Sequence, residues 1–124
     1  MINTIKKPDD FIRRVLHLEG PGFTVSTACS SSAKVFAVAW RLIESGFCDA
    51  AVVGGVDSLC LTTLYGFNSL ELVSATPCRP ADSERNGISI GEAAGFAILE
   101  REPADGSHAK LPGYGEGIDA YHMS

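Results

Sequence analysis

The spacing of apolar residues changes abruptly around residue 29, and this change predicts two elements. Thr24 to Thr27 form a short run rich in β-branched residues, which is typical of a strand. From Lys34 onward the apolar residues recur as on one face of a helix, at Val35, Val38, Ala39 and Leu42. The pattern predicts a strand, a tight turn and then a helix that ends at Gly46, with Cys29 in the turn.

The remaining chain alternates between apolar segments and turn-forming residues. Apolar positions over 11–18 and, with a partial period, over 59–72 predict two further helices. The continuous apolar run over 50–56 predicts a strand buried on both faces, and residues 94–100 indicate another strand. Residues 73–86 are rich in turn formers and predict a loop. Because a strand, a helix and a strand follow one another from 24 to 56, we expect a right-handed parallel crossover in an α/β fold.

The composition narrows the classes of function. The chain has 124 residues, which is enough for one modest domain with a core, and its 45% hydrophobic and 20% charged residues are ordinary for a globular protein. The net charge of −5 gives no basic footprint, so nucleic acid is not expected as a partner. No apolar run reaches the length of a membrane span, and no apolar segment follows Lys6 and Lys7 as in a secretory signal. We therefore expect a cytoplasmic location and no membrane association.

The cysteines match no metal-binding or disulfide framework. Cys29, Cys48, Cys60 and Cys78 are separated by 19, 12 and 18 positions, which fits no zinc template, so no metal is expected. In a reducing cytosol disulfides are not expected either, and the last three thiols are interpreted as packing residues. Gly54 and the glycine that follows it match neither a dinucleotide nor a Walker pattern, and no cofactor is expected.

Cys29 is the candidate for chemistry. The start of a helix carries free N–H donors and a partial positive charge, and both favour a thiolate. Cys29 in the predicted turn is therefore a candidate nucleophile that would receive an acyl group. A cysteine is also often a small buried hydrophobe, and the local pattern alone leaves both interpretations open.

The residues around Cys29 resemble a known motif. Residues 26–32 read Ser-Thr-Ala-Cys-Ser-Ser-Ser, which is similar to the active-site motif of the β-ketoacyl-acyl carrier protein synthases, the condensing enzymes of fatty acid and polyketide synthesis. Segments 79–87, 87–95 and 119–124 resemble later family segments in the same order. The sequence departs from the family at Ala81, where an aromatic residue is usual, and at Asn86, where aspartate is usual.

This resemblance implies a fold and a quaternary structure. It indicates an incomplete N-terminal half of a thiolase-like fold, with layered helices on a mixed, mostly parallel sheet. Residues 1–124 would form a central segment of the synthase N-terminal domain, and 111–118 would be the last strand of that half. In the family the strand that leads into the cysteine pairs with its two-fold mate, so a homodimer through 24–27 is expected.

The resemblance also implies site residues and a partner. Cys29 would accept the acyl group, and Phe67 would border the acyl pocket, although an aromatic at that position can equally be a core residue. The partner would be an acyl carrier protein that bears an acyl or malonyl thioester. The family's two catalytic histidines lie in motifs that do not occur in residues 1–124. The sequence is therefore interpreted as an excerpt of a synthase, inactive alone in condensation and capable at most of the first half-reaction.

Two other functions remain open. The first is a non-catalytic dimerising or acyl-binding module, and the presence of Cys29 argues against it. The second is a coenzyme A-dependent acyltransferase of the thiolase type. Residues 79–95 argue against this second function, because they resemble the carrier-dependent synthases instead.

Overall fold

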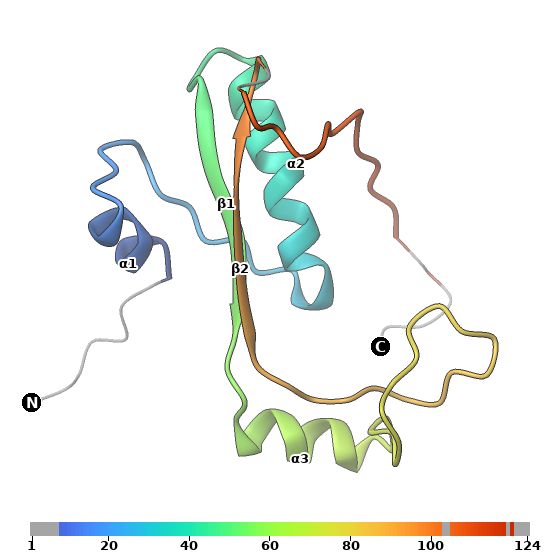
Figure 1. Ribbon diagram of the computed structural model, residues 1–124. Helices are drawn as coiled ribbons and strands as arrows, with labels where there is room; N and C mark the ends of the chain where they lie inside the picture. The colour runs from blue at the N-terminus through green and yellow to red at the C-terminus, as the bar shows by residue number, and fades with distance from the viewer. Residues whose placement is uncertain (1–7, 103–104, 119, 121–124) are drawn as a thin grey trace, which may run out of the picture. The chain divides into compact units, whose positions relative to one another are not determined.

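The computed structural model describes residues 8–102, 105–118 and 120. In chain order the elements are α1 (Pro8–Val15), a 3₁₀ turn (Ala28–Ser30), α2 (Ser31–Glu44), β1 (Ala50–Asp57), α3 (Leu61–Ser69) and β2 (Ala93–Glu100) (Figure 1). This order confirms the α/β class. The family signature predicted over 119–124 lies outside the described residues, apart from position 120.

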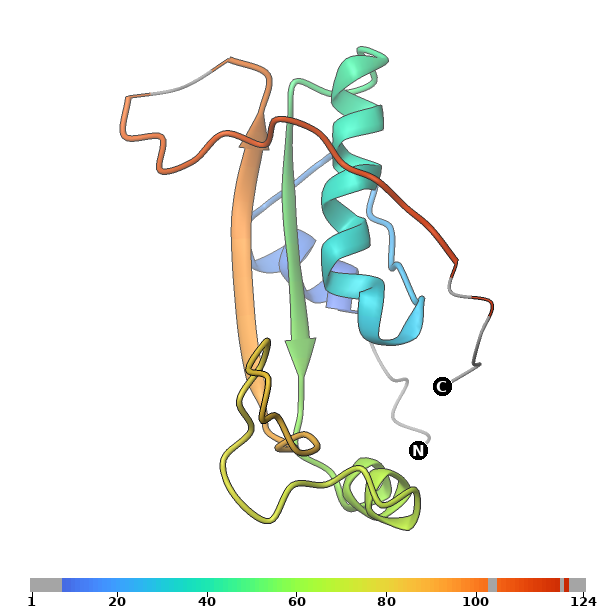
Figure 2. The same ribbon diagram turned by 90° about the vertical axis from the view of Figure 1, so that its right-hand side faces the viewer.

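The sheet differs from the prediction. β1 and β2 form a two-stranded sheet, and Figure 2 shows that they run antiparallel. The predicted strands at 24–27 and 111–118 are absent, so the expected parallel crossover and mostly parallel sheet are wrong for the described chain. A strand needs a partner for its backbone N–H and C=O groups. No described segment pairs with residues 24–27, and their β-branched side chains alone do not make a strand.

The chain divides into two compact units. The first comprises residues 1–24 and 54–96, and the second comprises residues 25–53 and 97–124. Helices α1 and α3 belong to the first unit, and α2 belongs to the second. None of the helices among the described residues is long and apolar enough to cross a membrane.

The core of the second unit is formed mainly by α2, with buried residues on more than one face of the helix. The buried apolar residues are Ala37, Ala39 and Ile43 of α2 and Val53 of β1. The helix ends as predicted at Gly46, whose φ of +72° is the left-handed conformation that glycine adopts without a steric cost. There the Phe47 N–H donates to the Leu42 carbonyl at 2.9 Å. Arg101, just after β2, donates to the Ile43 carbonyl and so attaches the end of the strand to the end of the helix.

Two helices of the described residues lie in the first unit, and both end earlier than predicted. Helix α1 begins at Pro8 and carries Asp9 and Asp10 in its first turn, where acidic side chains complement the helix dipole. The Thr24 hydroxyl donates to Asp9 Oδ1 at 2.5 Å and holds the following segment against α1. Helix α3 covers only the middle of the predicted range 59–72.

The loop after α3 is held by backbone contacts. Ile88 N–H donates to the Leu72 carbonyl at 2.8 Å, and Ser74 N–H donates to the Ile88 carbonyl at 2.8 Å. Gly87 adopts a φ of +72° beside this bridge, and a Cβ there would lie 2.6 Å from the Leu72 oxygen. The charged residues of 79–85 also bond to the backbone, since Asp82 Oδ1 accepts the Glu84 N–H at 2.7 Å.

Candidate active site

Cys29 lies in the 3₁₀ turn directly before α2, and its thiol is exposed. The prediction that the thiol sits at the start of this helix is confirmed, although no strand precedes it. The 3₁₀ turn and α2 are consecutive, so the chain changes direction at residues 27–28 and then stays helical to Glu44.

The bend before Cys29 depends on an unusual backbone conformation. Thr27 has φ −126° and ψ 40°, and Ala28 has φ +53°. The left-handed region is unfavourable for a residue with a Cβ, at a cost of about 1–2 kcal/mol. His17, Glu71 and Ala81 also have a positive φ, so the conformation alone does not mark a site; at Ala28 it sets the bend directly before Cys29.

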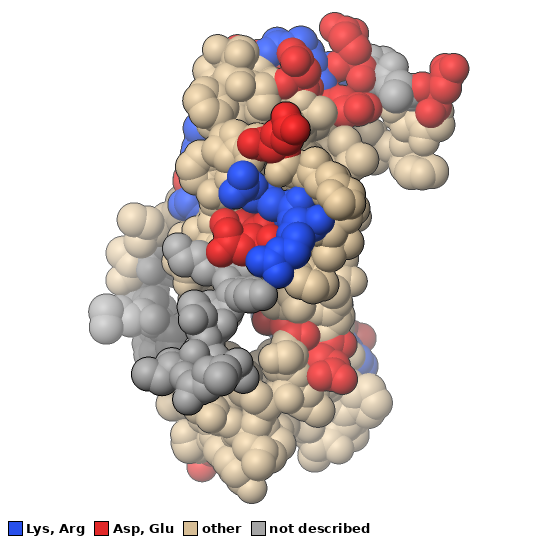
Figure 3. Space-filling view, turned by 90° about the vertical axis from the view of Figure 1, so that its left-hand side faces the viewer, with Lys and Arg blue, Asp and Glu red and all other residues tan. Residues whose placement is uncertain are grey.

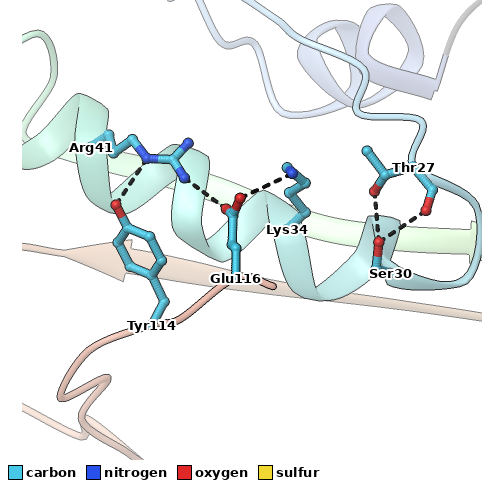
Figure 4. A network of polar contacts seen from close by, with 6 residues as sticks. All are labelled: Thr27, Ser30, Lys34, Arg41, Tyr114 and Glu116. Atoms are coloured by element: carbon cyan, nitrogen blue, oxygen red, sulfur yellow. Dashed lines mark hydrogen bonds and ion pairs between the residues drawn. The ribbon is translucent and has the colours of Figure 1, made fainter. Parts of the chain in front are cut away.

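Two serine hydroxyls bridge the bend. Thr27 N–H donates to Ser31 Oγ at 2.8 Å, and Ser31 Oγ donates to the Ala28 carbonyl at 2.7 Å. Ser30 Oγ donates to the Thr27 carbonyl at 2.9 Å and lies 3.0 Å from Thr27 Oγ1 (Figure 4). Each such bond contributes on the order of 1 kcal/mol net, so together they are comparable in size to the cost of the bend. In the sequence, Ser30 and Ser31 carry no signal beyond their place in the motif of residues 26–32, and only the structure reveals their role in the turn.

A polar cluster attaches the segment around residue 115 to α2. Glu116 accepts hydrogen bonds from Lys34 Nζ at 3.1 Å and from Arg41 Nη2 at 2.7 Å, while Arg41 Nε donates to the Tyr114 hydroxyl at 2.9 Å (Figure 4). The Tyr114 ring also meets the Trp40 ring edge-on, with centroids 5.9 Å apart. We call Lys34, Arg41, Tyr114 and Glu116 the α2 clamp. It holds an irregular segment on the helix that follows Cys29.

The α2 clamp should make stability depend on pH. The hydrogen bonds from Lys34 and then Arg41 lower the pKa of Glu116 below its usual value. A lowered folded-state pKa contributes stability above the unfolded pKa of about 4.3, and this contribution is lost as the pH falls through the folded-state value. We therefore expect the thermal midpoint of wild type to exceed that of Glu116→Gln near pH 7, and the gap to close below about pH 4.

Glu100→Gln is the matched control, because Glu100 lies in the same unit and has no recorded ion pair with the described residues. Thermal unfolding of the three proteins between pH 7 and pH 3 measures the effect. A gap for Glu116→Gln that is the same at every pH, or equal to that of Glu100→Gln, would contradict the expected clamp.

Phe67 lies in the first unit, on α3, and is half-buried. It lines an open pocket with a volume of about 370 Å³, together with Thr63 of the same helix and residues 57–58 and 89–93. Glu92 is exposed at this pocket, and its Oε2 accepts the Leu59 N–H at 3.1 Å. Cys29 belongs to the second unit and Phe67 to the first.

The interpretation of Cys60 as a packing residue is wrong. It is the exposed N-cap residue of α3, and its Sγ lies 3.0 Å from Thr63 Oγ1. Hydrogen bonds from the side chain and backbone of Thr63 lower the pKa of the Cys60 thiol. Cys48 and Cys78 are half-buried, as packing residues can be. The chain therefore presents exposed thiols at the starts of two helices, and any labelling of Cys29 has to be distinguished from labelling of Cys60.

The comparison with known proteins identifies the family. Residues 11–104 match the sequence profile described as beta-ketoacyl synthase, N-terminal domain. The chain belongs to the β-ketoacyl synthase family. It is similar to 3-oxoacyl-[acyl-carrier-protein] synthase 2 of Rhizobium meliloti (strain 1021), with 36% identity over 120 residues that cover 86% of this chain and 28% of that protein. The assignment of the whole range 1–124 to this domain stays a prediction.

The chain is also similar to a fungal polyketide synthase and to a ketosynthase of known structure. Non-reducing polyketide synthase pkdA of Emericella nidulans is 42% identical over 84 residues, which cover 66% of this chain and 3% of that protein. A ketosynthase solved in complex with its chain length factor, from Xenorhabdus doucetiae, superposes with a TM-score of 0.70 at 50% identity, over 78% of this chain and 24% of that one. The chain thus spans about 28% of the length of the synthase from Rhizobium meliloti. The structural match confirms the thiolase-like fold of the β-ketoacyl synthases.

Proposed function

We propose that Cys29 is the acyl-accepting nucleophile of a β-ketoacyl-acyl carrier protein synthase. The observation that carries the proposal is an exposed thiol on a sharp, serine-bridged bend at the start of α2, in a chain of this family. An exposed thiol can reach the carbonyl of an incoming thioester, and its thiolate is the reactive form of cysteine.

The first step transfers an acyl group from a carrier to the protein. The Cys29 thiolate attacks the carbonyl carbon of the acyl thioester, and a tetrahedral oxyanion forms. The backbone N–H of Cys29 stabilises this oxyanion, and an oxyanion donor of this kind contributes about 3 kcal/mol to such a step. The intermediate then collapses: the new C–S bond to Cys29 stays, the C–S bond to the carrier breaks, and the carrier thiolate leaves and takes up a proton.

The second step extends the chain. Loss of carbon dioxide from a malonyl thioester gives an enolate, whose carbon attacks the acyl-Cys29 carbonyl and expels the cysteine thiolate, so that a β-ketoacyl carrier results. In the family two histidines hold the thioester oxygen as the enolate charge develops, and their motifs do not occur in residues 1–124. The proposal for the residues of this chain therefore concerns the acylation step.

Phe67 is proposed as a contact for the acyl chain. Its half-buried ring lines the open pocket of the first unit, which gives an apolar surface beside solvent. Aromatic rings bind alkyl chains by burying apolar area, so a ring at a pocket wall suits this role.

The donor is proposed to be an acyl carrier protein. Residues 79–95 support this choice, because they resemble the carrier-dependent members of the family. The charge pattern gives little further support for a carrier protein as donor, since basic and acidic side chains lie beside one another on the face shown in Figure 3. Helix α1 shows the same mixture, with Asp9 and Asp10 followed by Arg13 and Arg14.

A homodimer through residues 24–27 is part of the proposal. These residues form no ladder with any described segment. Thr27 uses its N–H and its carbonyl within the bend, so the backbone groups offered to a second chain are those of residues 24–26. Phe23, which directly precedes this segment, is also exposed. Exposed apolar surface is typical of regions that meet another protein surface.

The test is covalent loading of the intact protein. We expect incubation with an acyl carrier thioester to add one acyl group, which peptide mapping by mass spectrometry locates on Cys29. The same acyl group on coenzyme A should load more slowly. Faster loading from coenzyme A would favour a thiolase-type acyltransferase, and the absence of any acyl group on Cys29 would favour a non-catalytic module.

A further inference from the structure

We infer that Ser31 is a positioning residue for Cys29, because its hydroxyl joins the Thr27 N–H to the Ala28 carbonyl across the bend that contains the strained Ala28. The inference rests on the proposed function for its role in catalysis. The bridge itself is a property of the described chain and can be tested without any substrate.

The conformation to be explained is that of Ala28. Its φ of +53° places an alanine where glycine or asparagine is the usual residue. Nothing in the side chain of alanine favours this conformation, so contacts from elsewhere have to hold it. The residue that follows is Cys29, and the direction of its side chain depends on this bend.

Ser31 is placed to supply those contacts. Its Oγ accepts the Thr27 N–H at 2.8 Å and donates to the Ala28 carbonyl at 2.7 Å, so a single hydroxyl bonds to the backbone before and after the Ala28 Cα atom. Ser31 is also the first residue of α2, so it joins the bend to a rigid element. Ser30 supports only one side, through the Thr27 carbonyl at 2.9 Å.

Ser32 provides a matched control for substitution of Ser31. Ser32 is the next residue, is exposed, and its hydroxyl makes no recorded hydrogen bond with the described residues. Both serines lie in the first turn of α2, so replacing either by alanine changes helix propensity to the same extent. A difference between the two variants therefore reports the bridge rather than the loss of a serine from the helix.

The expected consequence is a slower reaction at Cys29. Without the bridge Ala28 returns to ordinary backbone conformations, and the thiol no longer points consistently toward an incoming carbonyl. A displacement of about 1 Å in a reacting group can reduce a rate about a hundredfold. We expect Ser31→Ala to lower the single-turnover acylation rate of Cys29 10- to 100-fold, while the KM for the acyl carrier stays within twofold.

Three readouts on the intact protein test the inference. The first is the acylation rate of Ser31→Ala, Ser32→Ala and Ser31→Thr, where threonine retains the hydroxyl and should restore the rate to within about threefold. The second is the rate at which a small neutral thiol reagent alkylates Cys29, followed by peptide mapping so that Cys60 is counted separately. The third is the thermal midpoint, which should be similar for the two alanine variants, because the strain released at Ala28 offsets the two hydrogen bonds lost in Ser31→Ala.

A double-variant comparison tests whether Ser31 acts through Ala28. Glycine at position 28 adopts a positive φ without a steric cost, so the loss from Ser31→Ala should be smaller in an Ala28→Gly background. Equal losses in both backgrounds would overturn the inference. So would a Ser31→Ala variant that reacts as fast as Ser32→Ala, or a slow variant that Ser31→Thr does not restore.

These outcomes separate the inference from the proposed function. If wild type carries no acyl group on Cys29, the proposed function fails, and the alkylation rates still decide whether Ser31 positions the thiol. If wild type is acylated but Ser31→Ala and Ser32→Ala behave alike, the proposed function stands and the inference fails.

Discussion

Replacement of Cys29 by serine is expected to abolish acyl-enzyme formation, with a loss of about a thousandfold or more in the rate of covalent loading. A serine hydroxyl stays protonated at neutral pH unless a base activates it, whereas a thiol is a strong nucleophile as soon as a small fraction ionises. Mass spectrometry of the intact protein after incubation with an acyl carrier thioester measures the loss.

Cys60→Ser is the matched control for Cys29→Ser. Cys60 is also an exposed cysteine at the start of a helix, and hydrogen bonds to Thr63 lower the pKa of its thiol. By exposure and helix position alone, the two cysteines are similar candidates. We expect Cys60→Ser to leave acyl loading within twofold of wild type. Loss of loading in Cys60→Ser but not in Cys29→Ser would reverse the assignment.

The distinction between these cysteines depends on the backbone that precedes each one. Cys60 has φ −136° and ψ 150°, which is an ordinary conformation for an N-cap residue. Cys29 follows Thr27 and the left-handed Ala28, and two serine hydroxyls hold that bend. Both cysteines therefore lie at the start of a helix. Of the two, Cys29 is the one that follows a bend held by serine hydroxyls.

Local patterns in the sequence were sufficient to predict the elements that local interactions stabilise. Helix α2 was predicted from its apolar stripe and from Gly46 at its end, and β1 and β2 were predicted from their apolar runs. These features depend on neighbours within a few residues. The strand predicted over 24–27 failed because a strand requires a partner, and no described residues supply one.

Contacts between distant positions could not be predicted. Tyr114 and Glu116 lie more than seventy residues after their partners on α2, and nothing in their sequence context indicates those partners. The bend at Ala28 could not be predicted from the sequence for a different reason: unlike glycine, alanine does not favour a positive φ. The site was thus recognised from the motif around Cys29, while the groups that shape it became visible only in the structure.

The second large effect is a loss of stability, expected on substitution of Gly54 in β1. A Cβ at this position would overlap the Phe96 ring and the Gly95 carbonyl oxygen of β2. The ring of Phe96 is about half exposed and can turn away, but the carbonyl belongs to the backbone of the paired strand. We expect Gly54→Ala to reduce the free energy of unfolding by about 3 kcal/mol, at the upper end of the cost of overpacking, because the two strands would have to separate.

Gly95→Ala provides the comparison, since a Cβ at Gly95 meets nothing within 4 Å. Alanine costs less conformational entropy than glycine in a strand, so this variant should be at least as stable as wild type. A further variant, Gly54→Ala with Phe96→Leu, separates the two contacts. If the carbonyl is the obstacle, a smaller side chain at 96 restores little of the loss in a urea or thermal unfolding curve. Gly54→Ala as stable as Gly95→Ala would show that the strands do not approach as closely at Gly54 as this structure requires.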